Sequence, residues 1–366
     1  MNRREEHEAK IAKLRELMPE AGLDGLLLST PANFAWATAG GNAVVSSIAP
    51  LAVASLLVTA DRVCVVCSGI EAPRMADEEV GELGCEISPF DWWRGEVHAA
   101  ARKTCKGRLG ADHTARGFKD VSGLIAPLRF SLCEPEVERF RKVALAAGEA
   151  IGETARLLEP GIHESEAAGR LRESLSARGL ESVVTLVAAD ERIAKYRHPV
   201  VTEQSAKETI MLVTCARRWG LIAAATRIVR FAPAARDIRR KHDAVAFVDA
   251  AMIAATRPGA AFADILQRGI AAYRERRFGK EWKLHHQGGP AGYAPREFVA
   301  TPRETRSVVV NQAVAWNPSI TGTKSEDTIL ALADRTEIVT ESPDWPMIAV
   351  EVEGQVIRRP DLLVLG

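Results

Sequence analysis

The sequence lacks an excess of charge of either sign. Its 366 residues include 48 Lys plus Arg and 48 Asp plus Glu, which gives a formal net charge of +0. A balanced chain creates no broad electrostatic field toward nucleic acid or anionic membranes. The one basic run, Arg239-Arg240-Lys241, is typical of a solvated helix face. We therefore expect no nucleic acid and no membrane as partners.

Targeting segments and long apolar runs are also lacking. Residues 1–13 are densely charged and contain none of the apolar core of a secretory signal. Residues 43–60 carry no charge, but Pro50 interrupts this run and Asp61-Arg62 ends it before a second apolar run begins. This pattern favours a hairpin of buried strands over a membrane span. We expect a cytoplasmic protein.

Complete zinc and phosphate motifs are missing as well. Cys64 and Cys67 form a C-x-x-C, but no second such pair or Cys/His pair completes a tetrahedral set of ligands. The pair lies in a strand-like run, where residues three apart point to opposite faces. We therefore interpret both as buried, reduced thiols. No G-x-x-x-x-G-K motif is present, and no G-x-G-x-x-G follows a strand.

The length of the chain predicts two domains, because single hydrophobic cores stop growing near ~250–300 residues. Strands and short helices alternate up to about Leu128, which indicates a first α/β domain. Glu134-Pro135-Glu136 is typical of a helix start, and an apolar stripe with helical spacing follows it. We place the domain boundary near Phe130.

The second part of the chain repeats one order of elements. One predicted helix ends at Pro160-Gly161 and is followed by a second helix and a strand that leads to His198. A later helix ends at Pro258-Gly259 and is followed by another helix and His285-His286. Each half then supplies a further apolar strand. This repetition predicts an internal pseudo-two-fold with a central groove, to which each half contributes a histidine.

At these residues the chain resembles the creatinase/aminopeptidase P/prolidase ("pita-bread") family. The resemblance is carried by Ala21 to Leu28 with Pro31-Ala32-Asn33-Phe34, by Pro135-Glu136-Val137-Glu138, and by Ser325-Glu326-Asp327-Thr328. It implies an α/β (α+β) fold with a creatinase-like N-terminal domain, residues 1–130. A pita-bread domain with the internal repeat, residues 131–366, would follow. It also implies a homodimer.

Members of this family usually hold two divalent ions with two aspartates, a histidine and two glutamates. The resemblance places these ligands, in order, on Val213, Ala224, His286, Asn317 and Glu326. Aliphatic side chains donate nothing to a hard cation, and a carboxamide is a weak, neutral ligand. We therefore expect no cofactor. A single weakly held divalent metal on His286 and Glu326, completed by Asp327 or Asp190, stays open.

The groups that remain favour acid–base chemistry on imidazole. We expect His198, His286 and Glu326 to be catalytic, with a histidine as general base and the carboxylate orienting an imidazole. Substrate binding is expected from four further residues: Arg197, Tyr293, Asn317 and Lys324. The resemblance to creatinase implies a precedent for metal-free cleavage of a C–N bond. We expect the substrate to be a small nitrogenous compound or a short peptide.

Other interpretations stay open at this point. His285-His286 could form a structural turn, His198 could cap one, and Glu326 could lie in an exposed acidic pair. Cys215 shares a strand face with Val213, so a thiolate nucleophile is conceivable, although an inert buried thiol is the more frequent case. The chain could also be a non-catalytic peptide- or ligand-binding protein, or a metal-dependent Xaa-Pro aminopeptidase.

Overall fold

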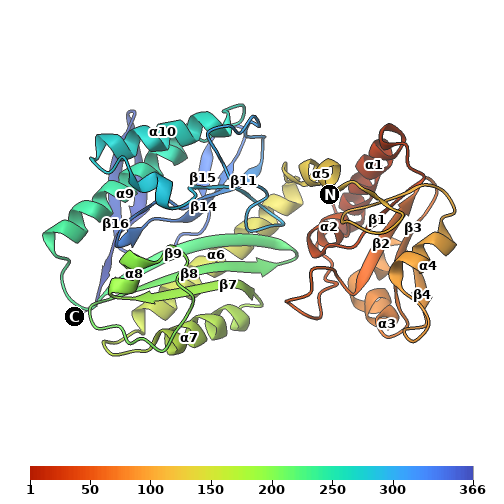
Figure 1. The fold of residues 1–366 in the computed structure, drawn as a ribbon, viewed down its shortest axis with the longest axis horizontal. Coiled ribbons are helices and arrows are strands. Elements are labelled where there is room, and N and C mark those ends of the chain that lie inside the picture. Colours follow the sequence, from red (N-terminus) through yellow and green to blue (C-terminus); the bar gives the residue numbers. More distant parts are fainter. Residues whose placement is uncertain (366) are drawn as a thin grey trace. The chain divides into compact units, whose positions relative to one another are not determined.

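The computed structural model describes residues 1–365, and the chain divides into two compact units (Figure 1). The first unit comprises Met1–Glu136 with Trp219–Leu221, and the second comprises Val137–Arg218 and the chain from Ile222 onward. The sequence places a boundary after residue 130, and the compact units divide after Glu136. Both units combine helices with sheets, so the predicted α/β fold class is confirmed.

A six-stranded sheet in the order β4-β3-β2-β1-β5-β6 forms the centre of the first unit. Helix α1 (Arg3–Ala21) precedes it and starts with a capping box, in which Asn2 and Glu5 each bind the other's backbone N–H through their side chains. The helix ends at Gly22, whose φ of 67° is accessible to glycine without strain. The other elements are β1 (Gly25–Leu28), α2 (Pro31–Ala37), β2 (Ala54–Thr59), β3 (Val63–Ser68), α3 (Ala72–Arg74), η1 (Met75–Glu79), η2 (Gly81–Leu83), β4 (Glu86–Phe90), α4 (Val97–Thr104), β5 (Leu109–Ala111), β6 (Lys119–Asp120), α5 (Ser122–Ile125) and η3 (Ala126–Arg129).

The uncharged run in this unit forms the predicted hairpin. Strand β2 pairs antiparallel with β3, in a register that places Ala54 opposite Cys67. All of β2 is buried, which explains why the run carries no charge. Cys64 and Cys67 are buried and free, as predicted. Among residues 1–365, no helix has both the length and the apolar character needed to cross a bilayer.

The second unit contains two four-stranded sheets, β18-β9-β8-β7 and β10-β11-β14-β15. Its first half contains α6 (Glu134–Arg156), α7 (Glu164–Ala177), β7 (Glu181–Ala189), α8 (Glu191–Lys195), β8 (Thr209–Arg218) and β9 (Leu221–Arg230). Its second half contains α9 (Arg236–Ala255), α10 (Phe262–Glu275), η4 (Glu281–Leu284), β10 (Gly288–Ala291), β11 (Gln312–Trp316), β12 (Ser319–Ile320), β13 (Thr323–Lys324), β14 (Asp327–Ala331) and β15 (Thr336–Ile338). The elements β16 (Met347–Val352), β17 (Gln355–Pro360) and β18 (Leu363–Val364) complete the unit.

The two halves of this unit repeat the same turn with the same hydrogen bonds. Gly161 and Gly259, each after a proline, have φ values of 93° and 87°. The N–H of Gly161 donates to the carbonyl of Ala206 at 2.7 Å, and that of Gly259 donates to the carbonyl of Val308 at 2.8 Å. Since the match extends from element order to single bonds, the predicted internal repeat is confirmed.

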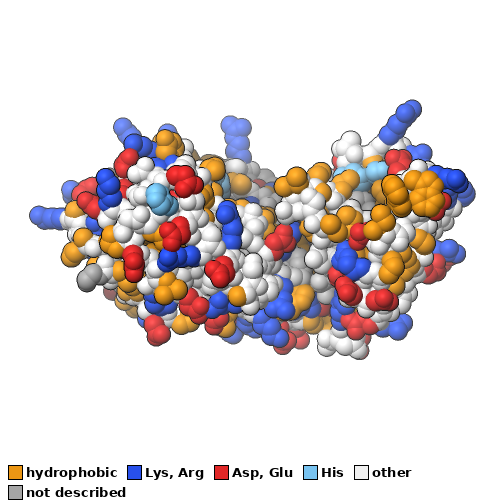
Figure 2. All heavy atoms as spheres, turned by 90° about the horizontal axis from the view of Figure 1, so that it is seen from below, with side chains coloured by type: hydrophobic (Ala, Val, Ile, Leu, Met, Phe, Trp, Pro, Cys, Tyr) orange, Lys and Arg blue, Asp and Glu red, His pale blue; other side chains and the backbone are white. Residues whose placement is uncertain are grey.

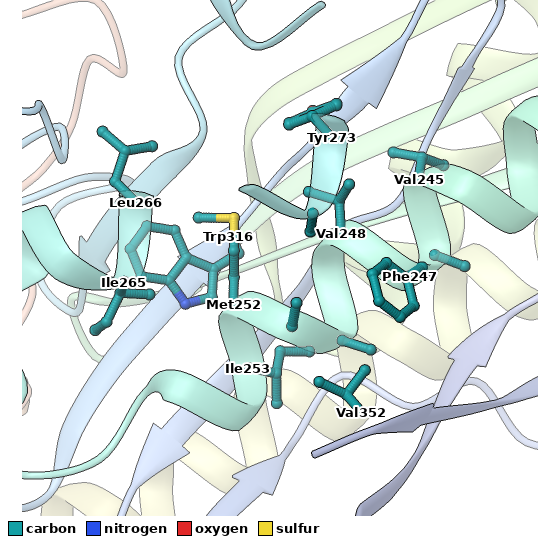
Figure 3. Close-up of a cluster of buried hydrophobic side chains, with 14 of the residues drawn as sticks. Val245, Phe247, Val248, Met252, Ile253, Ile265, Leu266, Tyr273, Trp316 and Val352 are labelled. Carbon is teal, nitrogen blue, oxygen red and sulfur yellow. The ribbon is translucent and has the colours of Figure 1, made fainter. Parts of the chain in front are cut away.

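The core of the second half lies between its two long helices and the adjoining sheet. Figure 3 shows Val248 and Met252 of α9, Ile265 and Leu266 of α10, and Trp316 of β11 in one cluster. All five side chains are buried. The indole N–H of Trp316 donates to the hydroxyl of Thr256 at 2.9 Å, so its polar atom is satisfied in the core.

Gly148→Ala is expected to lower the free energy of unfolding by about 1–3 kcal/mol, because α6 packs closely at this position. A Cβ on Gly148 would lie 2.7 Å from the carbonyl oxygen of Thr340 and would clash with that of Glu341. Gly169 of α7 has no such neighbours within 4 Å. The control Gly169→Ala should therefore raise stability by about 0.5–1 kcal/mol. Urea denaturation of both variants measures the difference, and a stable Gly148→Ala would contradict the packing.

Charges of both signs are mixed on the surface. Figure 2 shows Lys and Arg side chains interspersed with Asp and Glu over the face in view. This distribution matches the equal totals of 48 basic and 48 acidic residues.

Candidate functional site

The two halves of the second unit meet where strand β9 lies beside the segment that enters β14. The N–H of Thr226 donates to the carbonyl of Glu326 at 3.1 Å, and the N–H of Ala224 donates to the hydroxyl of Thr328 at 2.9 Å. These bonds link the two sheets across the internal repeat. They place Thr226 of β9 next to Glu326.

A cluster of three imidazoles combines residues from both halves. His198 follows α8 in the first half, and His285 and His286 follow η4 in the second. The ring centroid of His198 lies 5.0 Å from that of His285 and 5.7 Å from that of His286, and the two adjacent rings are 4.6 Å apart. The structure thus brings together the two predicted histidines, His198 and His286. It adds His285, which the sequence-based selection did not include.

The carboxylate of Glu326 is buried and binds two cations. Its Oε2 accepts from Lys324 Nζ at 2.6 Å and from Thr226 Oγ1 at 2.6 Å, and its Oε1 accepts from Arg296 Nη2 at 2.9 Å. Burial alone would raise the pKa of Glu326, but Lys324 and Arg296 outweigh it and lower the pKa to about 2. With one anion and two cations, this group has a formal charge of +1.

The three imidazoles are held in their neutral form. Burial is the largest cause in each case, and the nearby cations add to it. Burial and Lys324 lower the pKa of His285 to about 2, and burial and Arg296 lower that of His286 to about 4. Burial and Lys324 also lower the pKa of His198, which is the exposed member of the cluster. Each of the three rings therefore offers an unprotonated nitrogen near pH 7.

The predicted substrate-binding residues fall into different settings. Lys324 binds Glu326, as described above. Arg197 donates to the carboxylate of Glu281 in η4 and to the hydroxyl of Thr321, which follows β12, both at 2.9 Å. These bonds link three segments that are distant in the sequence. Tyr293 is buried, with its backbone N–H 3.2 Å from a carboxylate oxygen of Glu297.

Asn317 and Cys215 are both buried near this region. The amide oxygen of Asn317 has no hydrogen-bond partner in the structure, so an unused acceptor is present at this position. Burial raises the pKa of Cys215 to about 11. The thiol therefore stays protonated near neutral pH, which argues against the thiolate nucleophile considered from the sequence.

Arg296 is a site residue that the sequence-based selection missed. It lies in the glycine-containing segment after β10, three positions beyond Tyr293, and its side chain is largely buried against Glu326. The signal that could have identified it is an arginine within a few residues of Tyr293, in the segment that follows His286 and the glycines. His285 was missed because its neighbour, His286, already matched the family position.

The residues present do not fit a pair of divalent metal ions. Val213 and Ala224 are buried side chains without donor atoms. Both oxygens of Glu326 are bound by Lys324 and Arg296, which would repel an added dication. Among residues 1–365, neither group of side chains that could hold an ion includes Glu326.

The carboxylates that could have completed a single-ion site are also engaged. Asp327 accepts from Arg227 at 3.0 Å and from Arg359 at 2.7 Å. Asp190 accepts the backbone N–H groups of residues 207 to 209. Neither carboxylate is placed to support an ion on His286 and Glu326.

Comparisons with solved structures establish the fold. A Xaa-Pro dipeptidase from Bacillus anthracis superposes with a TM-score of 0.78 at 19% identity, covering 98% of this chain and 100% of that chain. The prolidase from Pyrococcus horikoshii OT3 (TM-score 0.78, 17% identity) and the X-Pro aminopeptidase from Thermotoga maritima MSB8 (TM-score 0.74, 17% identity) each cover 91% of this chain and 98% of their own. A search of curated protein sequences finds no match.

Family models match both parts of the chain. The model of the creatinase/prolidase N-terminal domain matches residues 10–143, and that of metallopeptidase family M24 matches residues 138–341. The resemblance inferred from the sequence motifs is confirmed. The chain therefore belongs to metallopeptidase family M24, with a creatinase/prolidase N-terminal domain, which places it among the hydrolases that act on peptide C–N bonds.

Proposed function

We propose that the chain is a metal-independent hydrolase that cleaves a C–N bond in a small nitrogenous compound or short peptide bearing a carboxylate. The observation that carries this proposal is the pair of fixed cations on Glu326. Lys324 and Arg296 supply positive charge beside the histidine cluster without any ion. The net charge of +1 on this group favours an anionic substrate.

In this proposal His198 acts as the general base, because it is neutral near pH 7 and is the exposed member of the cluster. It takes a proton from a water molecule, whose oxygen attacks the carbon of the scissile bond. Lys324 and Arg296 stabilise the negative charge that develops on the substrate. The C–N bond then breaks, and the protonated His198 returns its proton to the leaving nitrogen.

Two further residues have supporting roles in the proposal. The buried, unpaired oxygen of Asn317 can accept an N–H from the substrate, which would satisfy an otherwise orphaned acceptor. Glu326 positions the two cations, since its hydrogen bonds go to Lys324, Arg296 and Thr226. Two of the relatives named above are a Xaa-Pro dipeptidase and an X-Pro aminopeptidase, so dipeptides ending in proline are the first substrates to test. The proposal also includes a homodimer, as the family resemblance implies, and a cytoplasmic location.

The test uses the full chain after dialysis against EDTA, with metal content measured by mass spectrometry. Xaa-Pro dipeptides, creatine-like amidino acids and cyclic amidines are assayed with and without Mn²⁺ or Co²⁺. We expect hydrolysis of at least one compound without added metal, and no stimulation by Mn²⁺ or Co²⁺. Hydrolysis that requires either ion would overturn metal independence. Binding of these compounds without turnover would instead support a binding protein.

His198→Gln is expected to lower kcat about 10²–10⁴-fold, because the general base is lost. The matched control is His163→Gln, a histidine of the same unit whose Nδ1 lies 2.7 Å from the carbonyl oxygen of Glu203. This variant should hydrolyse the substrate at the original rate. Equal activity of His198→Gln and the parent protein would exclude His198 as the base.

A further inference from the structure

The histidine cluster has the geometry of a metal site of a different kind from the family's carboxylate site. One ring nitrogen from each of His198, His285 and His286 lies within 4.8 Å of the other two. The Nε2 atoms of His198 and His285 are 3.2 Å apart. Three nitrogen atoms from two halves of the repeat thus lie close enough together to hold one ion.

We propose that His198, His285 and His286 bind a single divalent transition-metal ion of the zinc type, reversibly and without a carboxylate ligand. This binding does not depend on the proposed hydrolase activity. Zinc–nitrogen bonds of about 2.0–2.1 Å in a tetrahedral site place neighbouring ligand atoms roughly 3.3 Å apart. The separation of 3.2 Å between the two Nε2 atoms is close to this value. The ligand nitrogen of His286 lies within 4.8 Å of both and supplies the third corner.

An unsatisfied nitrogen in the cluster supports this assignment. His286 Nδ1 is buried and has no hydrogen-bond partner in the structure. A buried polar atom left unpaired costs about 1–3 kcal/mol, and coordination would remove that cost. His285 Nδ1 lies 3.5 Å from the hydroxyl oxygen of Ser319, which can fix the ring with its Nε2 lone pair toward the cluster.

The surrounding groups select the type of ion. Three imidazoles suit Zn²⁺, Co²⁺, Ni²⁺ or Cu²⁺, whereas Mg²⁺ and Mn²⁺ prefer oxygen ligands. Lys324 and Arg296 oppose any cation and Glu326 offsets only one of them, so the net charge of +1 weakens the site. We therefore expect an exchangeable ion instead of a permanent one.

If the proposed function holds, the bound ion also inhibits hydrolysis, because it occupies the lone pair with which His198 would accept a proton.

The experiment titrates the metal-stripped full chain with Co²⁺, followed by visible absorption, and with Zn²⁺, followed by calorimetry. We expect one equivalent of each ion per chain and no binding of Mg²⁺. His285→Ala and His198→Gln should each raise the Kd at least tenfold. Circular dichroism and thermal melting verify that each variant is folded, and Ser319→Ala provides a milder variant that should raise the Kd less.

The matched control is the pair His98 and His113 in the first unit, whose Nε2 atoms are 2.9 Å apart but which lack a third ligand within reach among residues 1–365. His98→Gln should leave the Kd for both ions unchanged. Absence of Co²⁺ and Zn²⁺ binding, or equal binding by the parent and both cluster variants, would overturn the metal site. If the ion binds but hydrolysis continues at the metal-free rate, the metal site stands and only its inhibitory effect is rejected.

Discussion

Glu326→Gln is expected to lower the free energy of unfolding by about 3–5 kcal/mol, since removing one partner of a buried ion pair leaves the other uncompensated. In the parent protein, Glu326 is 2% exposed and binds both Lys324 and Arg296. The amide removes the only negative charge of this group and raises its formal charge from +1 to +2. Urea denaturation followed by circular dichroism measures the loss.

A double variant tests whether the instability of Glu326→Gln comes from its change of charge or from its change of side-chain shape. In the double variant Glu326→Gln with Lys324→Met, only Arg296 remains charged, so the formal charge returns to +1. We expect this variant to be more stable than Glu326→Gln alone by at least ~1 kcal/mol, within the range of coupling energies between contacting residues. Hydrolysis should nonetheless be about 10²–10³-fold slower than in the parent, because Lys324 no longer stabilises the developing charge. A double variant less stable than the single one would contradict the electrostatic explanation.

The fold and part of the site could be predicted because they depend on patterns along the chain. Apolar runs and turn residues identify the β2–β3 hairpin, and the repeated Pro-Gly turns identify the internal duplication. Such a duplication brings equivalent positions of the two halves together. The structure places His198 and His286 near each other in this way, with ring centroids 5.7 Å apart.

Contacts that depend on the path of irregular segments could not be predicted. Arg296 reaches Glu326 across 30 residues of sequence, and Arg197 reaches Glu281 across 84. No periodicity encodes either pairing. The contact of His285 with the cluster could not be predicted either, because adjacent side chains in extended backbone generally point to opposite faces. Its extended backbone follows the end of η4, and the two rings still lie 4.6 Å apart.

Arg359→Met is expected to destabilise the second unit by about 3–5 kcal/mol, because Arg359 links two buried carboxylates. Arg359 is fully buried, and its Nη2 lies 2.6 Å from Asp249 and 2.7 Å from Asp327. Asp327 keeps Arg227 as a partner in this variant, whereas Asp249 keeps only the hydroxyl of Ser325. The control is Arg358→Met, the exposed neighbour on the opposite face of β17, which should change stability by less than ~0.5 kcal/mol.

The loss of stability in Arg359→Met should depend on pH in a defined direction. Burial raises the pKa of Asp249 to about 6 even though Arg359 opposes the change, so removal of Arg359 raises it further. In the unfolded chain the carboxyl has its ordinary pKa of ~3.9, and the folded state therefore binds more protons between the two values. Stability falls with rising pH across that interval, and in Arg359→Met the interval extends above pH 6. Urea denaturation should thus show a larger difference in the free energy of unfolding between the parent protein and Arg359→Met at pH 8 than at pH 5. An equal deficit at both pH values would mean that Arg359 stabilises the unit through packing and not through the charge of Asp249.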